Sequence, residues 1–141
     1  MTKLFFKYGT VSSGKSVRLL VDVYQYEQTH NDNSAIVIKP AMDTRRGKDM
    51  IWSRVGLERK ADYCIGNSDA IPVQDIISRN PSCVFVDEVQ FLSMIHIDEL
   101  ALLSLTIPVV CYGLRVSWKG SLFPPISVLM AKADKIEEIK T

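Results

Sequence analysis

The 141-residue chain has few cysteines, no long hydrophobic run and almost no excess of charge of either sign. Its three cysteines, Cys64, Cys83 and Cys111, are far apart in sequence, so they form no C-x-x-C ligand pair. An odd number of cysteines in such a chain also argues against a disulfide framework. Cys83 and Cys111 lie within short apolar runs, which predicts two buried thiols that behave as small hydrophobic residues.

Charge and hydrophobicity exclude further classes of protein. Lys and Arg total 17 and Asp and Glu total 16, so the net charge of +1 gives no basic excess for binding nucleic acid or an anionic membrane. The apolar runs are far shorter than the ~20 residues that span a bilayer. Lys7 interrupts a short apolar stretch near the N-terminus, which does not resemble a signal peptide. We therefore expect no nucleic-acid or membrane partner, and a cytoplasmic protein by default.

Alternating strand and helix patterns predict a single α/β domain over residues 1–141. Helical spacing predicts helices at 17–28, 72–78, 93–105 and 127–133, and short β-branched or apolar runs predict strands at 4–8, 35–39, 61–65, 82–86, 108–112 and 135–140. Strands separated by helices predict βαβ units, hence a mainly parallel sheet with helices on both faces. Residues 41–60 are highly charged and contain two glycines, and we interpret them mainly as a loop.

What the sequence does contain is a phosphate-binding motif. The pattern G-x-x-x-x-G-K-[ST] is matched, between a predicted strand and a predicted helix, by Gly9, Thr10, Val11, Ser12, Ser13, Gly14, Lys15 and Ser16. In this context backbone N–H groups and the helix N-terminus bind phosphate oxygens, Lys15 reaches the β- and γ-phosphates, and the Ser16 hydroxyl binds Mg²⁺. The motif predicts a P-loop NTPase-like, RecA-like fold that binds a nucleoside triphosphate. An ordinary Gly/Ser-rich turn is the alternative.

A second motif, Asp87-Glu88, follows the apolar residues 84–86. A carboxylate after a buried strand lies at the carboxyl edge of the sheet, where Asp87 would bind Mg²⁺ directly or through water. Glu88 is then placed to take a proton from a nucleophile. Water as nucleophile would make the protein an ATPase, and a substrate hydroxyl would make it a kinase; a nucleotide-binding module without transfer activity stays open as well. The alternative for the acidic pair is a strand end that faces solvent.

Apolar and aromatic residues downstream predict a small pocket for a nucleobase, with core packing as the alternative. Together with the two motifs above, the segments KPAMDTR at 39–45, SRVGL at 53–57, VDEVQFL at 86–92 and PVVCYGLR at 108–115 resemble the cytosolic (type II) thymidine kinases. The chain is most similar to the bacterial and phage branch of this family, from about residue 3 to its end. The resemblance implies transfer of the γ-phosphate of ATP to the 5′-hydroxyl of thymidine or deoxyuridine, in deoxynucleoside salvage.

The resemblance also implies roles for individual residues. Glu88 matches the general base, and Asp87 and Gln90 join residues 9–16 in the triphosphate and Mg²⁺ site. The thymine pocket is expected to be lined by Phe91, Leu114, Trp118 and Phe123. Arg45 falls where an arginine lies near the transferred phosphate, and a solvated loop charge is its alternative role.

Two departures from the family pattern affect these expectations. Where the family commonly reads RTDFRGELF, residues 115–123 read RVSWKGSLF, so Ser117 replaces an acid and Trp118 is a bulkier aromatic. Family members also continue beyond the position of Thr141 with a zinc-bearing lasso that covers the thymine. We therefore expect no zinc in the residues given, and weak or no thymidine kinase activity unless a partner or neighbouring subunit supplies the cover. Family members commonly form tetramers, so a homotetramer is a further expectation from the resemblance.

Overall fold

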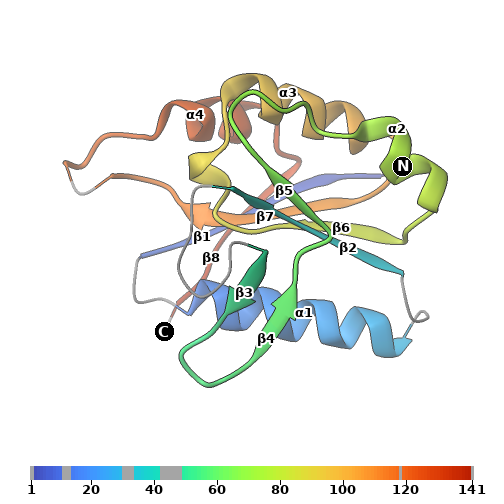
Figure 1. Ribbon diagram of the computed structural model, residues 1–141. Helices are drawn as coiled ribbons and strands as arrows, with labels where there is room; N and C mark the ends of the chain where they lie inside the picture. The colour runs from blue at the N-terminus through green and yellow to red at the C-terminus, as the bar shows by residue number, and fades with distance from the viewer. Residues whose placement is uncertain (1, 11–13, 30–33, 42–48, 118, 141) are drawn as a thin grey trace.

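A computed structural model describes residues 2–10, 14–29, 34–41, 49–117 and 119–140. Its centre is a six-stranded sheet with the strand order β5-β2-β6-β7-β1-β8, in which every neighbouring pair is parallel (Figure 1). The strands are β1 (Leu4–Gly9), β2 (Ala35–Pro40), β5 (Tyr63–Ile65), β6 (Cys83–Val86), β7 (Val109–Leu114) and β8 (Lys135–Glu138). This confirms the α/β, P-loop NTPase-like fold class predicted from the sequence.

Helices cover both faces of the sheet, as the βαβ pattern predicts (Figure 1). One face carries α1 (Lys15–Thr29), and the other carries α2 (Val73–Arg79), α3 (Met94–Leu103) and α4 (Pro124–Lys132). A single 3₁₀ turn, η1 (Val89–Phe91), joins β6 to α3. Within the described part of the chain, none of the helices is both long and apolar enough to cross a bilayer.

Alternation along the strands divides the buried residues into two hydrophobic cores. In β1, β2, β6 and β7 the side chains at one parity pack with α2, α3 and α4, among them Phe6, Ile38, Val86 and Cys111. The side chains at the other parity, such as Val37, Phe85 and Tyr112, pack with α1. Because successive strand residues point to opposite faces, a sheet buried on both sides reads as a continuous apolar run. This explains why the strands were recognisable in the sequence.

Residues 41–60 differ from the sequence interpretation. In place of a loop the structure has an antiparallel hairpin of β3 (Met50–Trp52) and β4 (Glu58–Lys60), while residues 42–48 lie outside the described part of the chain. The turn is closed by Ser53, whose backbone N–H donates to the Leu57 carbonyl and whose hydroxyl accepts the Leu57 N–H. Gly56, at φ +90°, supplies the left-handed residue that this turn requires. The two strands have only three residues each, too few for a periodic signal.

Helix α4 begins at Pro124, three residues earlier than the predicted helix at 127–133. Pro124 and Pro125 occupy its first turn, where a missing backbone N–H costs no hydrogen bond and the fixed φ of proline suits a helix. The predicted helix did not include these two prolines.

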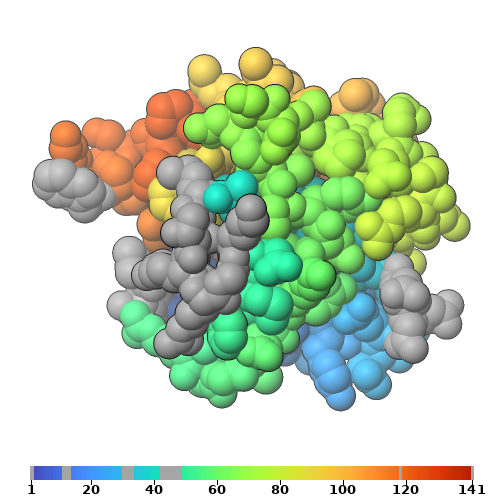
Figure 2. Space-filling model, viewed as in Figure 1, coloured from blue at the N-terminus to red at the C-terminus, as the bar shows by residue number. Residues whose placement is uncertain are grey.

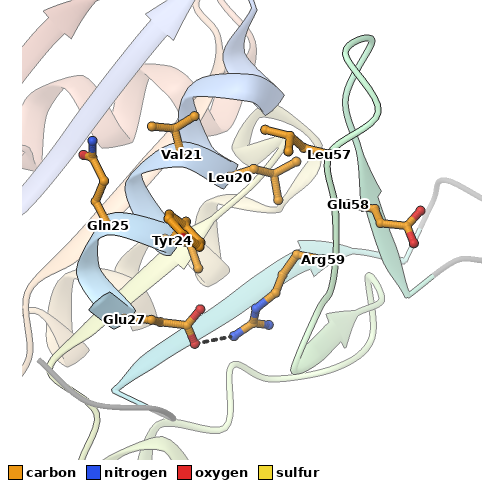
Figure 3. A pocket seen from close by; sticks show the side chains of 9 residues that line it. Leu20, Val21, Tyr24, Gln25, Glu27, Leu57, Glu58 and Arg59 are labelled. Atoms are coloured by element: carbon orange, nitrogen blue, oxygen red, sulfur yellow. Dashed lines mark hydrogen bonds and ion pairs between the residues drawn. The ribbon is translucent and has the colours of Figure 1, made fainter. Parts of the chain in front are cut away.

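The hairpin is fastened to α1 and to the sheet edge (Figure 3). Ile51 is buried in the core beneath α1. The Arg59 guanidinium lies 3.4 Å from a Glu27 carboxylate oxygen on α1 and 3.4 Å from Asp62. Figure 2 shows the green hairpin residues beside the blue surface of α1. Between them remains a mainly apolar cavity of about 370 Å³, which includes Leu20 and Leu57 and which Figure 3 shows in close-up.

Cys83 and Cys111 are buried in β6 and β7, as their apolar surroundings predict. Burial raises the pKa of Cys83 to about 12, and it also raises the pKa of Cys111. Because the thiolate is the reactive form, we expect neither thiol to react with a thiol reagent at pH 8 in the folded protein, and both to react after unfolding. Colorimetric titration with and without denaturant measures this. Rapid labelling of Cys83 or Cys111 in the native chain, located by mass spectrometry, would contradict the predicted burial.

Candidate functional site

The predicted phosphate-binding motif lies between β1 and α1, at the carboxyl edge of the sheet. Gly14 has φ +81°, a conformation that glycine adopts at little cost, and an added Cβ would meet no atom within 4 Å. Helix α1 begins directly after it, and the Arg18 N–H donates to the Gly14 carbonyl at 2.9 Å. The loop therefore leads into a helix N-terminus, whose free N–H groups favour anionic ligands.

Lys15 is largely buried, with 7% of its surface exposed, and its ammonium donates to the Thr10 carbonyl at 3.3 Å. This hydrogen bond joins the Lys15 side chain to Thr10, the residue that follows β1. Ser16 lies next to it in the first turn of α1. Val11, Ser12 and Ser13, also predicted to bind phosphate, lie outside the described residues.

Asp87 lies directly after β6, and its backbone N–H donates to the Ile38 carbonyl at 2.9 Å. The residue is 5% exposed, and its Oδ1 has no hydrogen-bond partner among the residues that the structure describes. Burial, followed by the negative charge of Glu88, raises the pKa of Asp87 to about 7, although Lys15 and Lys39 oppose the shift. A carboxylate oxygen that is buried without a hydrogen-bond donor destabilises the folded state, because it has lost its hydration. A bound cation would offset this loss.

The donor set fits Mg²⁺. This ion prefers hard oxygen ligands and in nucleotide sites takes only one or two carboxylates together with substrate phosphates. Asp87 Oδ1 provides one such oxygen, which is buried and has no hydrogen-bond partner within the described part of the chain. Lys15 is close enough to Asp87 to lower its pKa, so the phosphate-binding loop and the carboxylate are near each other. Asp87 and the Ser16 hydroxyl are the residues that would hold the ion.

Glu88 has a left-handed backbone, with φ 49° and ψ 44°. This conformation costs a non-glycine residue about 1–2 kcal/mol, and such outliers gather at functional sites. One of its carboxylate oxygens accepts a hydrogen bond of 2.5 Å from the Gln90 side-chain amide. Gln90 itself is 3% exposed, and its amide oxygen accepts the Leu114 backbone N–H at 3.1 Å.

A cavity of about 390 Å³ brings the two motifs together. Gly14, Lys15 and Ser16 line it from the phosphate-binding loop, Glu88 lines it from the end of β6, and residues 52–55 of the hairpin line it as well. A phosphate group beside Lys15 and an acceptor hydroxyl beside Glu88 would thus share one cavity. The arrangement suits transfer of a phosphoryl group between two bound molecules, because catalysis of this reaction depends mainly on positioning and electrostatics.

Three residues predicted to line a thymine pocket, Phe91, Leu114 and Phe123, lie in the described part of the chain. Phe91, on η1, and Phe123, at the start of α4, meet edge to face with ring centroids 6.2 Å apart at 80°. Phe91 is 40% exposed, so this pair is not sealed in the core. Leu114 ends β7 next to them in the fold and is joined to Gln90. Trp118 and Arg45, the other two residues predicted to bind substrate, lie outside the described residues.

Two features of the site escaped the sequence interpretation. The first is the hairpin, whose residues 52–55 form one wall of the cavity. The second is Lys39, which is 3% exposed at the end of β2 and donates to the Met50 carbonyl at 2.8 Å, so that it ties the hairpin to the sheet edge beside Asp87. Gly56 after the polar residues Ser53 and Arg54 was a turn signal that could have revealed the hairpin.

Comparisons with known proteins agree with this geometry. A family model described as thymidine kinase matches residues 2–141. Among curated relatives, a protein named thymidine kinase from Streptococcus thermophilus is 40% identical over 144 residues, which covers 100% of this chain and 72% of the relative. Proteins of the same name from Enterococcus faecalis and Listeria monocytogenes are 37% and 35% identical, and the chain covers 73% and 74% of them.

Proposed function

Because the chain belongs to the thymidine kinase family, we propose that it transfers the γ-phosphoryl group of ATP to the 5′-hydroxyl of thymidine. The observation that carries this proposal is the single cavity lined by Lys15, Ser16 and Glu88. It gives a phosphate-binding group and a potential base access to the same cavity. A phosphoryl donor and a hydroxyl acceptor both need such access.

The triphosphate of ATP is held by the loop at residues 9–16. Backbone N–H groups at the start of α1 bind the phosphate oxygens, and the Lys15 ammonium exchanges its contact with the Thr10 carbonyl for the β- and γ-phosphates. Asp87 and Ser16 would hold Mg²⁺, which when bound would neutralise charge on the phosphate oxygens. The side chain of Lys39 holds the hairpin wall in place by its bond to Met50.

Glu88 acts as the general base. Its carboxylate takes the proton of the thymidine 5′-hydroxyl while that oxygen forms a bond to the γ-phosphorus. The bond from the γ-phosphorus to the β–γ bridging oxygen breaks, and ADP leaves. Phe91, which is 40% exposed and meets the partly buried Phe123 edge to face, offers aromatic surface on which the pyrimidine of the acceptor would stack. Arg45 and Trp118 are proposed to contribute to the same half of the site.

The test is release of ADP by the purified chain with ATP and Mg²⁺, in the presence and absence of thymidine. We expect ADP only when thymidine is present, with thymidine monophosphate formed in equal amount. Equal ADP release without thymidine would identify an ATPase. Calorimetric binding of ATP without any ADP release would identify a nucleotide-binding module, and either result would overturn the proposal.

A further inference from the structure

We propose that Gln90 is a positioning residue for Glu88, and that Gly113 keeps open the space that Gln90 occupies. This inference rests on the proposed function, in which Glu88 is the base, and it changes the role of Gln90 from binding nucleotide to orienting the base. It concerns residues of the segment that follows β6, which includes η1, and of the end of β7.

The hydrogen bonds of Gln90 use both ends of its amide. The nitrogen donates to a Glu88 carboxylate oxygen at 2.5 Å, and the oxygen accepts the Leu114 N–H at 3.1 Å. An amide has a fixed donor and a fixed acceptor, so these two bonds define its orientation. With 3% exposure, the side chain has little freedom to turn toward a nucleotide. A bond to a charged acceptor in such a buried position is among the stronger hydrogen bonds in proteins.

The topology of the sheet explains why the Leu114 N–H is available. Strand β6 ends at Val86, which pairs with Cys111, whereas β7 continues to Leu114. The side of β7 that faces β6 therefore has no strand partner beyond that point, and the Gln90 side chain takes the place of one. Gln90 thus links the base to a rigid strand. The left-handed backbone of Glu88 turns the chain back so that this link can form.

Gly113 is required for the same contact. A Cβ on this residue would clash with the Gln90 amide oxygen and would lie 2.8 Å from Val89 Cγ1. Gly113 does not have a positive φ, so its need for glycine arises from space and not from backbone conformation. A methyl group here would displace the amide that orients Glu88.

Gln90→Met tests the inference, because it keeps the length and burial of the side chain but can make neither bond. Without Gln90, the Glu88 carboxylate can move away from the acceptor hydroxyl. This movement should lower the rate of phosphoryl transfer much more than the affinity for ATP, because a misplacement of about 1 Å can lower a rate about 100-fold. We expect kcat to fall by about 10- to 100-fold, with KM for ATP within about a factor of two of the wild type. Gln74→Met, at an exposed position on α2, is the matched control and should leave kcat unchanged. A raised KM for ATP with kcat intact would instead assign Gln90 to nucleotide binding and overturn the proposal.

Gly113→Ala supplies a second, independent variant. If it acts by displacing Gln90, it should lower kcat in the wild-type background and have little further effect on kcat in the Gln90→Met background. Losses of kcat that multiply in the double variant would contradict the proposed role of Gly113.

Amide hydrogen exchange tests the same contacts and does not depend on enzymatic activity. The Leu114 N–H should exchange faster in Gln90→Met and in Gly113→Ala than in the wild type, and at the wild-type rate in Gln74→Met. An inactive wild-type chain with a protected Leu114 amide would count against the proposed function alone. An active chain whose Leu114 exchange is unchanged by Gln90→Met would count against the positioning role alone.

Discussion

Replacing Glu88 by Gln is expected to lower kcat for thymidine phosphorylation by about 10²–10⁴-fold, the contribution usual for a general base. Gln has the same shape, and its amide oxygen can still accept the hydrogen bond from Gln90. The substitution therefore removes the proton acceptor and preserves its surroundings. The Kd for ATP, measured by calorimetry, should stay within about a factor of two of the wild type, because the loop at residues 9–16 is unchanged.

Glu58→Gln is the matched control, since Glu58 is an exposed glutamate on β4 of the hairpin. It should leave both kcat and ATP binding unchanged. If Glu88→Gln retained wild-type turnover, Glu88 would not be the base. If it abolished ATP binding, Glu88 would belong to the triphosphate site.

Replacing Asp87 by Asn is expected to have opposite effects on nucleotide binding and on stability. Without the carboxylate, the affinity for ATP in the presence of Mg²⁺ should fall by at least about tenfold, because the ion loses the negatively charged ligand that the protein supplies. In the absence of nucleotide, however, the variant should be more stable than the wild type at pH 8 by about 1–3 kcal/mol. The reason is that Asp87 is buried with one carboxylate oxygen unpaired.

The same variant separates the pH dependence of Asp87 from that of the other groups. The pKa of Asp87 is raised from 3.8 to about 7 in the folded chain. Between these values the folded state keeps a proton that the unfolded state has lost, so the free energy of unfolding contributed by this group falls as pH rises. The difference in stability between Asp87→Asn and the wild type should therefore grow from pH 4 to pH 7 and then level off.

Denaturant unfolding at several pH values measures this difference. Asp98→Asn, at an exposed position on α3, is the control and should show no such growth. A wild type that gained stability relative to Asp87→Asn between pH 4 and pH 7 would mean that the Asp87 carboxylate is already well paired by Lys15 and Lys39. The inference that the Asp87 carboxylate destabilises the fold in the absence of a cation would then be wrong.

Much of the fold was predictable from local patterns. The strands β1, β2, β6 and β7 are buried on both faces, so each appears as a short apolar run, and α1 and α3 are long enough to show helical spacing. The hairpin was not predicted, because a three-residue apolar strand, Met50–Trp52, and a three-residue charged strand, Glu58–Lys60, are too short to show a period. The predicted helix at 127–133 left out Pro124 and Pro125, although proline is favoured in the first turn of a helix.

The candidate site divides in the same way. The sequence by itself determined the phosphate-binding loop and the Asp87-Glu88 pair, since each is a contiguous motif whose backbone context is local. Only the tertiary structure placed β7 between β1 and β6, closed the cavity with residues 52–55, and joined Gln90 to Leu114, 24 residues further along the chain. The contact between Gln90 and Leu114 depends on the order of the strands in the sheet and on the space that Gly113 leaves. Neither property can be predicted from a short segment of the sequence.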